Sequence, residues 1–162
     1  MECPMFFNNA VRTSRTNYKT TFKYHSLHFL SKDAIQRLNP NGTCLQVNRE
    51  TRVEFKPPKL FRSIRFGSFT STSVYPNNAT KLGSKSCFEV WICHGANVSK
   101  YSQYPAENEV LIPPYEKFKI KKVIKNHKNQ AAMKCETVYQ LKSSGIKSSL
   151  RCALFKKASG AL

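Results

Sequence analysis

Acidic residues are scarce in this chain. Its 162 residues include 9 Asp and Glu against 27 Lys and Arg, which gives a formal net charge of +18. Such a charge favours encounters with anionic partners in general, but the basic residues are spread along the chain, and only segment 119–128 approaches a basic run. Hydrophobic residues make up 40% of the chain and aromatic residues 12%, too many for a disordered basic tail. We therefore expect a folded body with a solvated basic surface and no dedicated nucleic-acid site.

Long hydrophobic runs are missing as well. No stretch approaches 18 consecutive apolar residues, so no helix is expected to span a membrane. The final residues, KKASGAL, lack the hydrophobic tail of a lipid-anchor signal. The apolar run within MECPMFFNNAVRTSR is too short for the core of a signal peptide. We therefore expect no membrane span and no anchor in this chain, and no signal peptide is visible in it.

The cysteines show no closely spaced pair. They occupy positions 3, 44, 87, 93, 135 and 152, and the absence of C-x2-C spacing argues against a zinc site. An even number of cysteines in a small basic chain favours disulfides. Three glycosylation sequons, which begin at Asn41, Asn78 and Asn97, favour the same extracellular or secretory compartment. A cytosolic chain with six reduced thiols is the alternative.

The hydrophobic period changes along the chain. Apolar residues recur at three- and four-residue steps from Tyr18 to Leu38, which predicts one amphipathic helix. After the turn sequence NPNG the period falls to two, around residues 64–69, 88–92, 118–120 and 133–141, which predicts half-buried strands. A helix followed by many strands is typical of an α+β domain with mostly antiparallel sheets. A chain of this length fits one domain, 1–162.

Two of the few carboxylates, Glu107 and Glu109, stand two positions apart in ENEVLI. If NEVLI begins a strand, the two side chains point to the same side. They are then either exposed strand-edge acids that balance nearby lysines, or a functional pair. In a functional pair, one carboxylate stabilises positive charge developing on a substrate and the other orients a nucleophile.

Two other segments carry polar side chains in strand-like surroundings. RFGSFTSTS (65–73) is predicted to be an alternating strand, with Ser71 and Ser73 on one side. Hydroxyl groups at a strand end are commonly local backbone partners. In LQVNRET (45–51), Arg49 either pairs with a carboxylate or presents its planar guanidinium to a phosphate.

An arginine on one strand, Ser-Thr-Ser on the next and Glu-x-Glu opening a later strand resemble, in that order, the arginine-specific mono-ADP-ribosyltransferases, and most closely their vertebrate ecto-enzyme branch. FNNAVRT, SLHFLSKDAIQRL, ENEVLIPPYEKFKI and YQLKSSG extend the resemblance over nearly the whole chain. It implies an ADP-ribosyltransferase-like α+β fold, in which an amino-terminal helix accompanies two packed, mostly antiparallel β-sheets around an NAD cleft. It also implies a single catalytic domain whose amino-terminal helical portion is largely missing.

The resemblance implies that NAD is the co-substrate and that arginine-containing proteins accept its ADP-ribose as nicotinamide is released, without a metal. Arg49 would hold the NAD pyrophosphate. Ser71 would orient the catalytic glutamate, Glu109, which would stabilise the oxocarbenium-like ribosyl cation. Glu107 would engage the guanidinium of the acceptor and help it attack, and Tyr104 would pack against the acceptor.

The resemblance also implies a disulfide between Cys44 and Cys87. One departure from the family pattern concerns Glu50, which follows Arg49 where the family has a small residue. A carboxylate beside a desolvated pyrophosphate is unfavourable, so a catalytically impaired relative that acts as a binding protein is the alternative. A basic nucleic-acid-binding secreted protein is a third hypothesis, but no motif supports it, because the four histidines show no pairing suited to ribonuclease chemistry.

Overall fold

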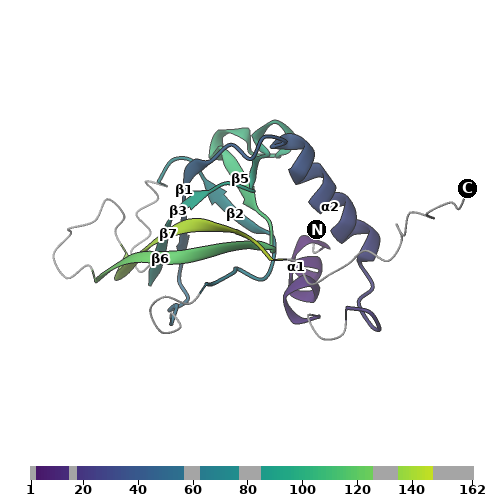
Figure 1. The fold of residues 1–162 in the computed structure, drawn as a ribbon, viewed down its shortest axis with the longest axis horizontal. Helices are drawn as coiled ribbons and strands as arrows, with labels where there is room; N and C mark the ends of the chain where they lie inside the picture. Colours follow the sequence, from purple (N-terminus) through teal and green to yellow (C-terminus); the bar gives the residue numbers. More distant parts are fainter. Residues whose placement is uncertain (1–2, 15–17, 57–62, 77–84, 126–134, 148–162) are drawn as a thin grey trace, which may run out of the picture.

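The computed structural model describes residues 3–14, 18–56, 63–76, 85–125 and 135–147. Two α-helices precede a sheet of seven strands (Figure 1). The helices are α1 (Cys3–Thr13) and α2 (His25–Leu38). The strands are β1 (Leu45–Thr51), β2 (Thr70–Ser73), β3 (Ser86–Ile92), β4 (Ala96–Asn97), β5 (Glu109–Ile112), β6 (Glu116–Lys125) and β7 (Thr137–Ile146). Neither described helix is long and apolar enough to cross a membrane.

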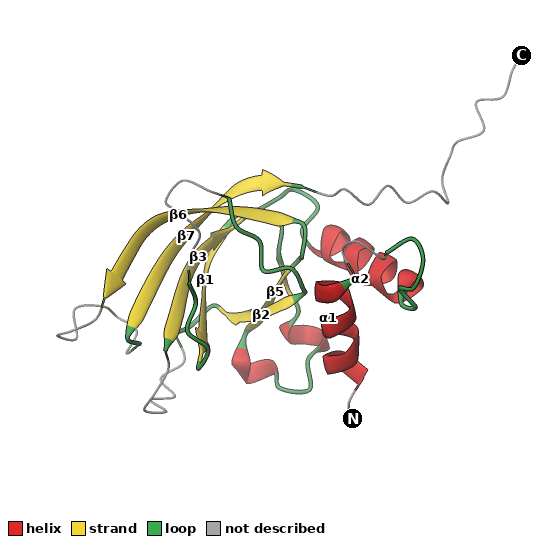
Figure 2. Cartoon of the chain, turned by 90° about the horizontal axis from the view of Figure 1, so that it is seen from below, coloured by secondary structure: helices red, strands yellow, loops and turns green. Residues whose placement is uncertain are grey.

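The sheet has the order β4-β5-β2-β1-β3-β7-β6, and all its neighbouring strands are antiparallel except β3 and β7. The predicted α+β class is therefore confirmed. The expected two packed sheets are, in the described residues, one hydrogen-bonded sheet that bends strongly (Figure 2). The bend follows from the pairing of β1. This strand shares seven residue pairs with β3 but only Asn48↔Ser73 with β2, so the two halves of the sheet are joined yet diverge.

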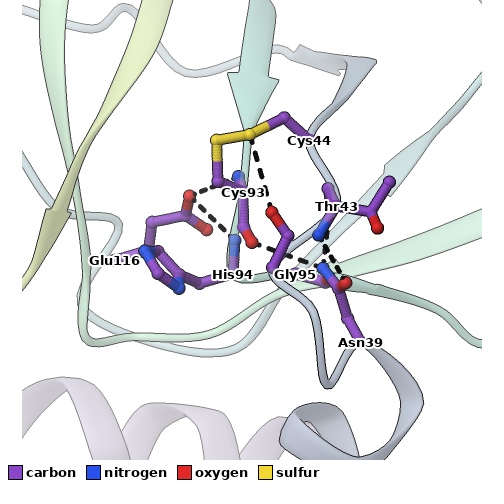
Figure 3. Close-up of a disulfide and its surroundings, with 8 residues drawn as sticks. Asn39, Thr43, Cys44, Cys93, His94, Gly95 and Glu116 are labelled. Atoms are coloured by element: carbon purple, nitrogen blue, oxygen red, sulfur yellow. Dashed lines mark hydrogen bonds between the residues drawn. A yellow bond between two sulfur atoms is a disulfide. The ribbon is translucent and has the colours of Figure 1, made fainter.

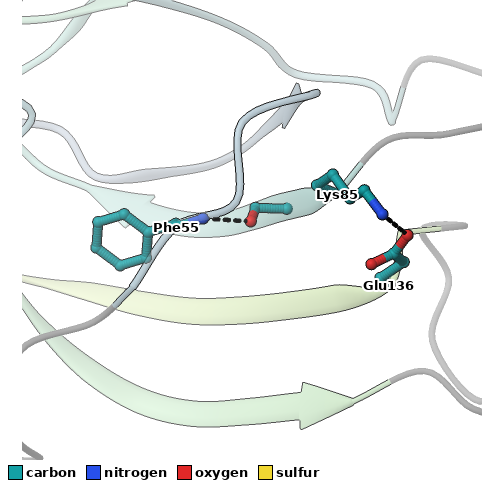
Figure 4. Close-up of polar contacts among 4 residues, drawn as sticks. Phe55, Lys85 and Glu136 are labelled. Atoms are coloured by element: carbon teal, nitrogen blue, oxygen red, sulfur yellow. Dashed lines mark hydrogen bonds and ion pairs between the residues drawn. The ribbon is translucent and has the colours of Figure 1, made fainter.

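The main core lies on one face of the sheet. Its buried members are Val47, Phe88, Val90, Ile92, Val110, Ile112, Phe118, Tyr139 and Leu141. Phe55 covers this cluster from the segment after β1, where its backbone N–H donates to the Ser86 hydroxyl at 2.9 Å (Figure 4). Its carbonyl oxygen accepts from the Tyr139 hydroxyl at 2.7 Å. Lys85 and Glu136 form an ion pair at the same end of the sheet (Figure 4), but both are exposed, so this pair contributes little to stability.

The helices differ from the prediction in two ways. The structure has a helix that the sequence analysis missed, α1, which packs through Phe7 on the rings of Phe69 and Tyr24 at centroid distances of 5.7 and 5.8 Å. A helix of 11 residues is marginal alone and depends on such contacts. The predicted helix is confirmed only from His25, because residues 18–21 form a turn.

Most predicted strands are present. The strand predicted at 65–73 is shorter, since β2 begins at Thr70 and Gly67 has a positive φ of 80° that an extended strand does not allow. The beginning of the strand predicted at 133–141 lies outside the described residues, and β7 follows from Thr137.

The expected disulfide between Cys44 and Cys87 is wrong. Cys44 is bonded to Cys93, and Cys87 to Cys135. The register of β1 on β3 explains this result. Leu45 lies opposite Ile92, so Cys44 meets Cys93, whereas Cys87 lies opposite Glu50. Six residues of strand separate positions 44 and 50, a distance of about 20 Å, which no disulfide can bridge.

A buried carboxylate supports the turn that follows β3. Glu116 is fully buried, and its Oε1 accepts hydrogen bonds from the backbone N–H groups of Cys93 and His94 at 2.8 and 3.2 Å (Figure 3). From the other side, the Asn39 side-chain amide donates to the carbonyl oxygens of Cys93 and Gly95 (Figure 3). The turn and its disulfide are therefore linked both to the end of α2, through Asn39, and to β6, through Glu116.

We expect Glu116→Ala to lower the free energy of unfolding by about 2–5 kcal/mol, because it leaves two backbone N–H groups without their acceptor. Glu116→Gln keeps an acceptor oxygen and should cost clearly less. Urea denaturation of both variants checks the prediction. Equal stability of Glu116→Ala and the unaltered chain would contradict it.

His28 is the buried histidine of α2. Its Nδ1 lies 3.2 Å from the Tyr18 hydroxyl, and its ring contacts Phe22 and Phe69. Burial, and after it the charges of Lys32 and His25, lower the pKa of His28 below its ordinary value of 6.5. The native state therefore takes up a proton on this ring at lower pH than the unfolded chain does.

The free energy of unfolding should fall as the pH is lowered through 6.5, because the unfolded chain binds the proton first. The fall should end below the lowered pKa, where both states are protonated. His28→Gln should make the profile between pH 7.5 and 5.5 flatter, and the same substitution at half-buried His94 serves as the control. Denaturant midpoints measured across this range check the expectation, which fails if the two variants give the same slope.

Candidate active site

The predicted site residues come from β1, β2, β5 and the turn before β5. Arg49 is half-buried on β1, and its Nη1 donates to the carbonyl oxygen of Ser71 on β2 at 2.6 Å. This contact lies beyond the single β1–β2 pair, where the two strands have diverged. The structure therefore brings Arg49 and the backbone of Ser71 together.

A second arginine, Arg12 of α1, lies close enough to Arg49 to affect its pKa. Its Nη2 donates to the Ser68 hydroxyl at 3.2 Å, just before β2. Burial and, second, the charge of Arg12 lower the pKa of Arg49, although a guanidinium stays protonated at neutral pH. Two neighbouring guanidinium groups create a positive potential that suits an anion such as a pyrophosphate. The sequence analysis gave Arg12 no role, and only its place in FNNAVRT could have indicated one.

Ser71 and Glu109 share one face of the β2–β5 pair. Ser73 lies directly opposite Glu109, and Ser71 directly opposite Leu111. Ser71 and Glu109 are therefore diagonal neighbours, whose Cα atoms are typically about 7–8 Å apart. The predicted common side of Ser71 and Ser73 is confirmed by this register, although Ser71 is exposed whereas the Ser73 hydroxyl is buried and donates to the carbonyl oxygen of Glu107 at 2.7 Å.

The two glutamates do not extend from one strand, so that expectation is wrong. Glu107 ends the 3-10 turn η2 (Pro105–Glu107), and β5 starts only at Glu109. Asn108 between them has a positive φ of 47°, which turns the chain. As a result Glu107 is exposed and Glu109 is half-buried. Tyr104 is exposed in the same turn, where its carbonyl oxygen accepts from the N–H of Glu107 at 3.1 Å.

Glu50 points away from the Arg49–Ser71 contact. Its carboxylate lies within 4.8 Å of the sulfur atoms of Cys87 and Cys135, on the side of β1 that faces β3 and β7, whereas Arg49 reaches toward β2. Within the described part of the chain, these three residues form a group that could in principle hold a metal ion. The two sulfur atoms are joined to each other in a disulfide, so neither is available as a metal ligand.

A cavity of about 240 Å³ lies at the end of α2, next to β4. Its lining includes Asn41 and Asn97, the acceptor residues of two sequons, and both are exposed. None of Arg49, Ser71 or Glu109 lines this cavity. The third sequon asparagine, Asn78, lies outside the described residues.

Comparison with known proteins places this chain in a family. The family model for NAD:arginine ADP-ribosyltransferases matches residues 2–145. The chain therefore belongs to the NAD:arginine ADP-ribosyltransferase family. It is 34% identical over 158 residues to GPI-linked NAD(P)(+)--arginine ADP-ribosyltransferase 1 of Oryctolagus cuniculus, a match that covers 93% of this chain and 46% of the relative. It is 38% identical over 120 residues to ecto-ADP-ribosyltransferase 5 of Mus musculus, covering 68% of this chain and 39% of the relative.

The fold agrees with this assignment. The solved structure of a mutant of the eukaryotic mono-ADP-ribosyltransferase ART2.2 in complex with NADH matches with a TM-score of 0.74 and 29% sequence identity. The match covers 96% of this chain and 66% of that one. The chain spans half or less of the length of the curated relatives above.

Proposed function

We propose that this chain transfers ADP-ribose from NAD to arginine side chains of acceptor proteins and releases nicotinamide. The observation that carries the proposal is that, in a member of this family, Arg49 of β1 contacts Ser71 of β2, which is a diagonal neighbour of Glu109 on β5. Support also comes from the single sheet shared by the described strands, which favours one catalytic domain over 1–162.

Arg49 holds the NAD pyrophosphate in this proposal, and Arg12 adds a second positive charge. Charge-assisted hydrogen bonds from guanidinium groups suit phosphate oxygens. A bound anion would offset the electrostatic repulsion between the two arginines. Ser71 stands where its exposed hydroxyl can orient Glu109 across the β2–β5 pair.

The two glutamates take different roles because their surroundings differ. As the bond between C1′ of the ribose and the nicotinamide nitrogen breaks, its electron pair leaves with nicotinamide, and half-buried Glu109 stabilises the positive charge on the ribose. An acceptor guanidinium nitrogen then bonds to C1′ and loses a proton. Exposed Glu107 engages this guanidinium and assists the proton loss, and Tyr104 packs against the acceptor from the same turn. The proposed chemistry uses carboxylates and needs no metal.

We expect Glu109→Gln to lower the rate of ADP-ribosyl transfer by a factor of about 100–1,000 or more, because the positive charge then develops without a compensating carboxylate. Glu107→Ala should abolish transfer to agmatine, an arginine analogue, while hydrolysis of NAD continues. Labelled NAD and released nicotinamide measure both activities. Glu54→Ala, at an exposed acid outside the site, should leave both unchanged.

If the unaltered chain neither transfers label nor releases nicotinamide at any NAD concentration, the enzyme proposal fails. The chain would then be the catalytically impaired relative that acts as a binding protein. Equal activity of the unaltered chain and Glu109→Gln would reject the role given to Glu109.

The orientation of Glu50 removes one argument against NAD binding. Since its carboxylate lies beside Cys87 and Cys135, we expect Glu50→Ala to change the dissociation constant for NAD less than about threefold. Arg49→Ala should weaken binding at least about tenfold, because charge-assisted hydrogen bonds are lost. Calorimetric titration with NAD measures both values. A large gain in affinity for Glu50→Ala would show that this acid repels the dinucleotide after all.

An extracellular or secretory location is proposed on the same basis. The printed names of the relatives include "GPI-linked" and "ecto", and this chain has two disulfides and two exposed sequon asparagines, Asn41 and Asn97. Disulfides persist in oxidising compartments. Glycans on Asn41 and Asn97 would lie at the end of α2.

A further inference from the structure

One face of the sheet carries an exposed tryptophan among lysines. Across neighbouring strands, Gln46 on β1 pairs with Trp91 on β3, Trp91 with Lys142 on β7, and Lys142 with Lys119 on β6. Paired residues in a sheet point to the same side. These four residues therefore form a row across the sheet, and all four are exposed, Trp91 by 41%.

A second row adds another lysine. Lys122 on β6 pairs with Gln140 on β7, which in turn pairs with Glu89 on β3. The Glu89 carboxylate accepts a hydrogen bond from the Gln140 amide at 2.8 Å. We call the set Gln46, Trp91, Lys119, Lys122 and Lys142 the Trp91 face. It lies on the side of the sheet opposite the main core, since the neighbouring positions 90 and 141 are buried in that core.

Within the described part of the chain, the lysines of the Trp91 face outnumber the carboxylates near them, of which Glu89 lies in the second row. Lys119 and Lys142 lie directly opposite each other, and like charges in such a pair are destabilising. Among the described residues, no ion pair joins Lys119, Lys122 or Lys142 to a carboxylate. An external anion bound over the pair would remove this repulsion.

The chemistry of the face indicates one kind of partner. Lysine ammonium groups are strongly hydrated point charges that attract anionic groups without fixing their orientation, and the five residues of this face include no guanidinium fork for bidentate recognition of a phosphate. An exposed indole offers a flat apolar plane on which the C–H groups of a sugar ring can pack. Single-stranded nucleic acids use several aromatic side chains along a basic groove, but this face offers one aromatic residue.

We propose that the Trp91 face binds a linear sulfated polysaccharide. Sulfate groups lie against Lys119, Lys122 and Lys142, and a sugar ring stacks on Trp91. The backbone of the face is fixed by the pairing of four strands, so little chain ordering opposes binding. None of the residues assigned to ADP-ribosyl transfer belongs to the face, so this proposal and the proposed function can fail independently.

Trp91 is the single tryptophan of the chain, so its fluorescence reports directly on this face. Titration with a heparin-derived octasaccharide should shift its emission, and a chemically desulfated octasaccharide should not. We expect Lys119→Gln/Lys142→Gln to weaken binding at least about tenfold and to lower the salt dependence of affinity by about two released ions. The matched control is Lys19→Gln/Lys23→Gln, which loses the same charge at exposed positions and should change affinity less than about threefold.

Thermal unfolding with and without octasaccharide shows that each variant is folded, and Lys142→Gln alone replaces the double variant if that chain does not fold. Three results would each overturn the proposal. The octasaccharide could bind without any change in Trp91 emission, or both double variants could lose affinity equally. A single-stranded oligonucleotide of equal charge could also bind more tightly and quench Trp91 more strongly, which would identify a nucleic acid as the partner.

Discussion

The antiparallel pairing of β1 with β3 is the constraint on which the rest of the structure depends. Seven consecutive pairs run from Leu45↔Ile92 to Thr51↔Ser86, and the Cys44–Cys93 disulfide lies just beyond the first pair. A slip of one residue would exchange every side chain between the two faces of the sheet. The main core, the direction of Glu50 and the Trp91 face all follow from this one register.

The candidate active site lies where regular pairing ends. β1 and β2 share one pair, and beyond it Arg49 bonds to the Ser71 carbonyl oxygen through its side chain. Divergence of two strands leaves polar groups accessible that a continuous ladder would use. The side chain of Arg12 on α1 reaches the same region, where it bonds to Ser68. A helix that adds little to the main core therefore contributes a positive charge to the candidate site. The carboxylates of Glu107 and Glu109 lie on the other side of β2 from β1, on β5 and the turn before it.

The basic residues of the chain occur in two different spatial arrangements in the structure. At the candidate active site, the positive charges of Arg12 and Arg49 lie close together near the start of β2. On the Trp91 face, three lysines spread positive charge over an open surface around an indole. The first arrangement suits a compact dianion such as a pyrophosphate, and the second suits charges distributed along a polymer. Net charge alone could not separate these two uses, because it does not depend on where the side chains meet.

The sequence by itself determined what depends on local pattern: the α+β class, a helix ending at Leu38, strands β1, β5 and β6, and the family, which the pattern around Arg49, Ser71, Glu107 and Glu109 predicted. Only the tertiary structure decided what depends on contacts between distant segments. Helix α1 needs Phe69 and Tyr24 for its stability, the cysteine pairing needs the register of β1 on β3, and the roles of Arg12 and Glu50 depend on which strand each one faces. Periodicity records which side of an element is buried, but it carries no information about the partner against which that side is buried.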